Sequence, residues 1–90
     1  MLPTLLTEGN YHSFKFWFNH QIQDGLLYQN ELFYRLKTVS ASDRMPLYRS
    51  ACIVARYDSV LVTVSRTEYS MWVSLRSPRL ADLLQELAKP

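Results

Sequence analysis

The sequence has little of what phosphate-binding and metal-binding proteins need. It contains two glycines, one cysteine and two histidines among 90 residues. With only Gly9 and Gly25, no glycine-rich loop can wrap around a phosphate group. His12 and His20 are too far apart along one strand to share a metal ion, and no other spacing resembles a zinc site. The sequence therefore predicts no cofactor and no metal centre.

The single cysteine excludes an intramolecular disulfide, which argues against a small secreted scaffold. Cys52 lies between Ala51 and Ile53 in an expected helix, a position typical of a small buried residue rather than of a nucleophile. The aspartates that stand near the expected helix ends have local structural roles: Asp43, Asp58 and Asp82. Since neither an activated nucleophile nor paired carboxylates can be identified, we expect a protein that is not an enzyme.

Long hydrophobic runs and runs of like charge are also absent. No stretch approaches the roughly 20 apolar residues of a membrane helix, and the first ten residues lack the basic start and apolar centre of a signal peptide. The formal net charge of +2 is too small and too dispersed for a strong, sequence-independent grip on phosphates. Together with the single cysteine, these absences predict a cytoplasmic protein that does not associate with membranes.

What the sequence does have is apolar and aromatic residues, which make up 48% and 13% of the chain. A chain of 90 residues has room for one modest core. We therefore expect residues 1–90 to form a single domain, in which residues 1–10 are an irregular N-terminal arm.

Alternating apolar and polar residues predict a first hairpin. Phe14, Phe16 and Phe18 alternate with polar or larger side chains, and a second alternating run covers residues 26–36. Residues 23–25, Gln-Asp-Gly, are expected to form the turn between them. A two-residue Asp-Gly turn and a three-residue loop ending in a left-handed glycine are both considered. We prefer the second, because it collects the apolar residues on one face of the sheet.

The rest of the chain predicts a helix, a second hairpin and a second helix. The first helix covers about residues 44–57, with Ser42 or Asp43 as its cap. Two alternating runs, residues 60–65 and 69–76, predict strands joined by a turn at residues 66–67. Ser77 and the proline that follows it predict a helix start. The last helix would carry one apolar stripe formed by Leu80, Leu83, Leu84 and Leu87.

The resulting order, ββαββα, predicts an α+β fold. We expect a four-stranded, mainly antiparallel sheet with both helices packed on one face. The two halves share the pattern of an alternating strand, a serine-bearing cap and an amphipathic helix. A loose duplication and convergent patterning explain this similarity about equally well.

The sheet face opposite the helices would gather aromatic and basic side chains. The candidate binding residues on this face are Lys15, Trp17, Phe33, Arg35, Lys37, Trp72 and Arg76. They would share it with Glu31, Thr63 and Ser74. Exposed aromatic rings and arginines are typical of protein interfaces. Rings and cations on an open sheet are also used by proteins that stack bases and neutralise phosphates.

The sequence therefore predicts a non-catalytic protein-interaction module or small subunit, with another protein or a second copy of the chain as its partner. Self-association would use the aromatic and basic sheet face. The alternative is a weak single-stranded nucleic-acid-binding protein. The ββαββα order and the aromatic pattern do not match the common RNA-recognition fold, so the protein partner is preferred.

Overall fold

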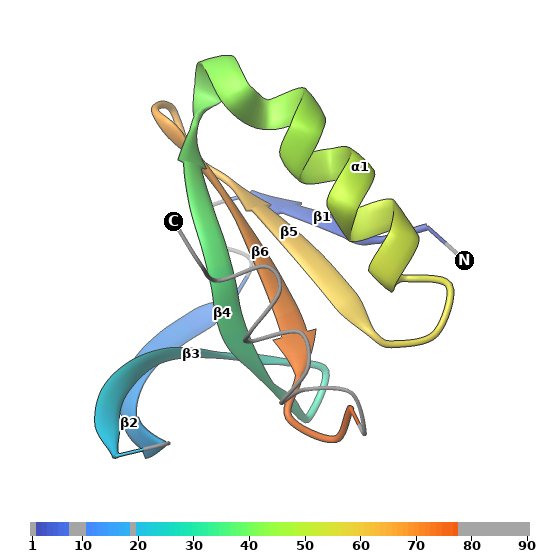
Figure 1. The fold of residues 1–90 in the computed structure, drawn as a ribbon. Coiled ribbons are helices and arrows are strands. Elements are labelled where there is room, and N and C mark those ends of the chain that lie inside the picture. The colour runs from blue at the N-terminus through green and yellow to red at the C-terminus, as the bar shows by residue number, and fades with distance from the viewer. Residues whose placement is uncertain (1, 8–10, 19, 78–90) are drawn as a thin grey trace.

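The protein is built around one six-stranded mixed sheet with the strand order β1-β5-β6-β4-β3-β2 (Figure 1). The computed structural model describes residues 2–7, 11–18 and 20–77. The strands are β1 (Thr4–Thr7), β2 (His12–Phe18), β3 (Gln21–Tyr28), β4 (Glu31–Ser40), β5 (Val60–Val64) and β6 (Glu68–Ser74). A 3₁₀ turn, η1 (Ala41–Asp43), and the helix α1 (Arg44–Val54) connect β4 to β5.

The predicted four-stranded sheet with two helices in ββαββα order is wrong. The sheet has six strands because β1 adds to one edge and because residues 12–40 form three strands instead of two. Within the described residues α1 is the one α-helix. The second predicted helix, with the stripe of Leu80, Leu83, Leu84 and Leu87, lies outside the described residues.

The N-terminal strand β1 replaces the irregular arm that the sequence analysis expected. β1 pairs in parallel with β5, so that Leu6 stands opposite Thr63. Leu6 is buried in this position, while its neighbour Leu5 is exposed. The strand therefore covers the edge of β5 and contributes one apolar side chain to the core.

The predicted turn at residues 23–25 is also wrong, because these residues lie inside β3. Phe18 pairs with Gln21 and Phe14 pairs with Gly25. The chain therefore reverses direction between Phe18 and Gln21, before the predicted turn. Gly25 serves a different purpose. A Cβ atom at this position would lie 2.9 Å from ring carbons of both Phe14 and Phe16. The glycine allows two aromatic rings to pack directly against the backbone of the neighbouring strand.

A tight turn that the sequence analysis missed joins β3 to β4. Tyr28 pairs with Glu31, and the two residues between them have positive φ angles of 49° for Gln29 and 63° for Asn30. Two successive positive φ angles are the mark of a type I′ turn, whose twist matches that of the flanking strands. Asparagine tolerates this conformation better than most residues do.

The predicted last hairpin and central helix are confirmed, although the helix ends at Val54 and not at the predicted residue 57. α1 covers Arg44–Val54, with Pro46 in its first turn, where proline costs no helical hydrogen bond. β5 and β6 pair antiparallel, with Val64 opposite Tyr69. The hydroxyl of Ser65 accepts a hydrogen bond of 3.0 Å from the backbone N–H of Glu68 and closes the turn.

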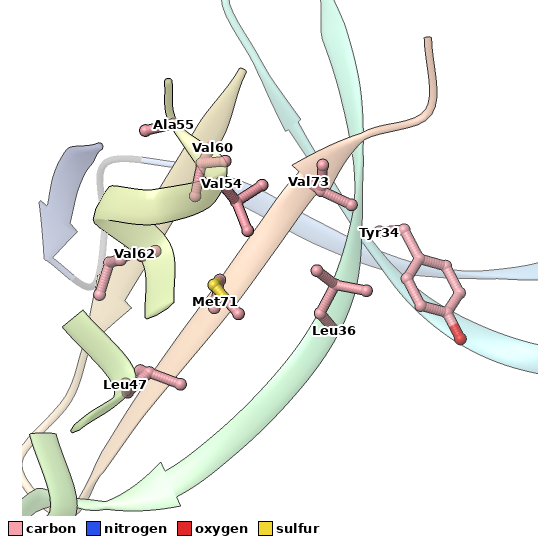
Figure 2. Packing of buried hydrophobic residues seen from close by; sticks show 10 residues of the cluster. Tyr34, Leu36, Leu47, Val54, Ala55, Val60, Val62, Met71 and Val73 are labelled. Carbon is pink, nitrogen blue, oxygen red and sulfur yellow. The ribbon is translucent and has the colours of Figure 1, made fainter. Parts of the chain in front are cut away.

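The main core lies between α1 and the strands β4, β5 and β6 (Figure 2). Its buried residues are Tyr34, Leu36, Leu47, Ala51, Val54, Ala55, Val60, Val62, Met71 and Val73. The alternation expected for the last two strands is confirmed, since Val60, Val62, Met71 and Val73 all face the helix. Figure 2 shows Tyr34 at the margin of this cluster, beyond Leu36.

The opposite face of the sheet holds a second, smaller cluster. Its buried members are Leu6, Leu26, Phe33, Leu61 and Trp72. No helix of the described residues covers this face. Figure 1 shows the β2–β3 hairpin curling out of the plane of β4, β5 and β6. A hollow on this face has walls from Ser13 in β2 and Asp24 in β3 on one side and from Thr63 and Ser70 on the other, so the sheet is concave here.

Candidate interaction surface

A row of interacting side chains crosses four strands on the concave face. Lys15 of β2 stands opposite Asp24 of β3, and the Asp24 carboxylate forms ion pairs with both Lys15 and Arg35 of β4. Arg35 stands opposite Trp72 of β6, with its guanidinium carbon 5.5 Å from the centroid of the indole ring. The sequence pattern predicted a turn at Asp24 and gave no sign that this residue is the partner of the two cations.

Trp72 is a core residue of the concave face. Its side chain is only 3% exposed, and its indole N–H donates a 2.9 Å hydrogen bond to the Thr63 hydroxyl. The guanidinium of Arg35 lies over the ring, an arrangement stabilised by the attraction between a cation and an aromatic face. The Trp72 ring is therefore covered by Arg35 and is not accessible for stacking with a ligand.

Phe33 is likewise buried, with 3% of its surface exposed. It stands between Leu26 of β3 and Ser74 of β6 in the ladder, inside the second cluster. Two of the three rings that the sequence analysis placed on the candidate surface are thus part of the core.

Trp17 is the exposed ring of the candidate set. It stands opposite Ile22 in the β2–β3 ladder, and the two side chains are 67% and 63% exposed. A cross-strand pair of this kind forms a small apolar patch on the outermost hairpin. The alternation of residues 14–18 correctly placed Trp17 on the face opposite Phe14 and Phe16.

Lys37 and Arg76 do not join this row. Leu36 follows the regular alternation from Tyr34 into the core under α1, but a bulge in β4 between Arg35 and Lys37 shifts the alternation beyond it, so that Lys37 stands opposite Met71. Lys37 then lines a hollow of about 360 Å³ with Leu47 of α1. Arg76 is exposed beyond the end of β6. No simple period-2 pattern could have revealed the bulge.

The concave face also holds an open hollow of about 210 Å³ beside the ion pairs. Its lining combines hydroxyl groups, among them those of Tyr11, Ser13 and Ser70, with the Asp24 and Arg35 side chains. Ser70 is itself engaged, since its hydroxyl lies 2.7 Å from that of Thr38. The hollow is therefore polar: Asp24 and Arg35 are ion-paired in its wall, and Glu68 adds a second carboxylate to its lining.

The outer edge of β2 completes the surface. β2 is the last strand of the sheet and, within residues 2–7, 11–18 and 20–77, it pairs with β3 alone. The strand has seven residues without glycine or proline. Phe14 on one face and Trp17 on the other are both exposed. Backbone groups along such an edge are available for pairing with another strand.

Cys52 lies on α1 and is half-buried beside Tyr48. Burial raises the pKa of the Tyr48 hydroxyl, and its electrostatic and hydrogen-bonding interaction with the neighbouring Cys52 raises it further. In the described part of the chain, no three side chains among histidine, cysteine, aspartate and glutamate are grouped as a metal site would require. None of the helices in that part has both the length and the apolar character needed to cross a membrane.

No protein-family model, curated protein or solved structure matches this chain.

Proposed function

We propose that this domain is a non-catalytic protein-interaction module that binds a partner polypeptide at the β2–β3 hairpin. The observation that carries the proposal is the exposed Trp17, opposite an equally exposed Ile22, on the terminal strand of the sheet. Tryptophan is among the residues most often found as energetic anchors of protein interfaces. The outer edge of β2, which borders no other strand of the described residues, can add backbone hydrogen bonds to the same surface.

The contacts that hold the hairpin on both faces support the same proposal. On one face, the rings of Phe14 and Phe16 pack against Gly25, and on the other Asp24 joins Lys15 to Arg35. A surface held on both faces loses little conformational freedom on binding, which favours affinity. The lone cysteine supports a cytoplasmic location for this interaction, which we propose with it.

The alternative, a weak single-stranded nucleic-acid-binding protein, finds less support. Such a protein needs free cations and open rings. Here Lys15 and Arg35 share the Asp24 carboxylate, and Phe33 and Trp72 are buried. A salt titration separates the two functions, because binding through phosphates weakens steeply as salt rises, whereas binding through an aromatic surface changes little.

The test is capture of a partner from an extract of the source cell by the immobilised full chain. We expect the wild type and Tyr57→Ser to retain the same proteins, and Trp17→Ser to lose them. Tyr57 is a matched control because it is 71% exposed and follows α1, away from the hairpin in sequence. Retention of the same proteins by Trp17→Ser would overturn the proposal.

A further inference from the structure

We infer that the partner of the hairpin is a second copy of this chain, joined antiparallel through β2 with Phe16 opposite its own counterpart and Lys15 opposite Trp17 of the other copy. This inference rests on the proposed function, since it names the occupant of the same surface. It would join two six-stranded sheets into one continuous sheet.

The two edges of the sheet differ in a way that singles out β2. β1, at the other edge, has four residues, and short edge strands resist pairing with further chains. β2 has seven residues, and Lys15 is the one Lys, Arg, Asp or Glu among them. A charged side chain is the usual protection of an edge strand. Because Lys15 is ion-paired with Asp24, that protection is weakened.

Symmetry restricts how two β2 strands can meet. With a two-fold axis perpendicular to the sheet, the concave face of one copy continues into the concave face of the other copy. Residues that stand opposite each other must therefore share the same phase of the alternation. The axis can pass through Phe14, Lys15 or Phe16, the three central positions of the strand.

The three registers differ in the side chain that stands opposite Lys15. An axis at Lys15 would place two like charges directly opposite each other, which is unfavourable. An axis at Phe14 would place Lys15 opposite Ser13. An axis at Phe16 places Lys15 opposite Trp17 of the second copy, where the apolar stem of the side chain that reaches Asp24 can lie along an exposed indole face.

The experiment measures the mass of the purified full chain across concentration by analytical ultracentrifugation. We expect the wild type to shift from monomer to dimer as concentration rises. Trp17→Lys and Trp17→Glu then test the register through the sign of the charge. The lysine would stand opposite Lys15 of the second copy and the glutamate would attract it. Because the symmetry repeats this contact, we expect the glutamate variant to dimerise at least about tenfold more tightly than the lysine variant.

Controls address folding and the competing register. Tyr57→Lys and Tyr57→Glu change the net charge equally at an exposed position outside β2, and both should dimerise like the wild type. Ser13→Lys would repel Lys15 only in the register centred on Phe14, so we expect little effect. Since Trp17 is exposed, its variants should retain the melting temperature of the wild type, which circular dichroism verifies.

Three results would overturn the inference: a wild type that stays monomeric at every concentration, equal weakening by Trp17→Lys and Trp17→Glu, or a larger effect of Ser13→Lys than of Trp17→Lys. A monomeric wild type whose capture of other proteins still depends on Trp17 would overturn the second copy as partner and leave the proposed interaction module standing. A dimer that follows the expected charge dependence supports the inference directly.

Discussion

The ring of Phe14 packs against the backbone of Gly25, which stands directly opposite it in the β2–β3 ladder. The ring of Phe16 approaches the same glycine, and the centroids of the two phenylalanine rings are 5.8 Å apart. Phe16 in turn meets Tyr34 edge to face, with centroids 6.4 Å apart. Tyr34 belongs to the core under α1, so this chain of rings connects the outermost hairpin to the centre of the domain.

Replacing Gly25 by alanine should therefore loosen the hairpin. The added methyl group would lie 2.9 Å from ring carbons of Phe14 and Phe16, and the rings would have to move away. We expect a loss of about 1–3 kcal/mol in the free energy of unfolding, as for other overpacked sites. Urea denaturation measures it. In the double variant with Phe14→Ala the two losses should be less than additive, because one clash is removed. Strict additivity would contradict the proposed contact.

Truncation of the two tryptophans should lower the free energy of unfolding by very different amounts. Trp72→Ser removes a buried ring and should lower the free energy of unfolding by about 3–5 kcal/mol. Trp17→Ser changes an exposed side chain and should cost less than about 0.5 kcal/mol. Thermal melts of the two single variants measure this difference. Similar losses for both would show that the burial of these rings is misassigned.

Thr63→Val tests the hydrogen bond that fixes the Trp72 indole. Valine has nearly the same shape but no acceptor, so the buried indole N–H would lose its partner. We expect a loss of about 1–3 kcal/mol. Thr38→Val is the matched control, because it removes a hydroxyl contact to Ser70 from a more exposed position and should cost less. Chemical denaturation of both variants gives the comparison, and an equal cost would count against the indole bond.

The Tyr34 hydroxyl should make stability depend on pH in the alkaline range. Burial raises the pKa of this phenol above its usual value of 10.0. The unfolded chain then loses the proton at a lower pH than the folded chain does. The contribution of Tyr34 is thus unchanged below pH 10 and falls as pH rises beyond it. Tyr34→Phe should show a shallower decline in denaturation midpoint between pH 9 and 11. An identical decline would exclude Tyr34 as its source.

Local patterns predicted the elements whose partners are near in sequence. The alternation of β5 and β6 and the start of α1 followed from apolar periodicity and from Pro46, whereas α1 ends at Val54 and not at the predicted residue 57. The prediction of the first hairpin was wrong, because the sequence Asp24-Gly25 is a strong turn signal and the turn was placed there. In the structure this glycine is required by two rings of the neighbouring strand, a contact that sequence alone does not reveal. The true turn at Gln29 and Asn30 has a weaker signal.

The candidate surface was predicted in part. The alternation placed Lys15, Trp17 and Arg35 on the correct face, but it could not show that Asp24 joins two of them. It also failed beyond Arg35, where the bulge in β4 moves Lys37 to the helix side. Burial of Trp72 follows from the curl of the whole sheet, which no single strand encodes.

The parallel pairing of β1 with β5 also bears on how the chain is made. The ribosome produces β1 before the other described strands, yet its only neighbour in the described sheet, β5, emerges after β2, β3, β4 and α1. Leu5 and Leu6 therefore leave the exit tunnel with no strand to join. A contact that closes so long a loop forms slowly. During synthesis, this leading segment is the part of the domain most open to capture by chaperones, and its docking completes the sheet only after the hairpins that follow it.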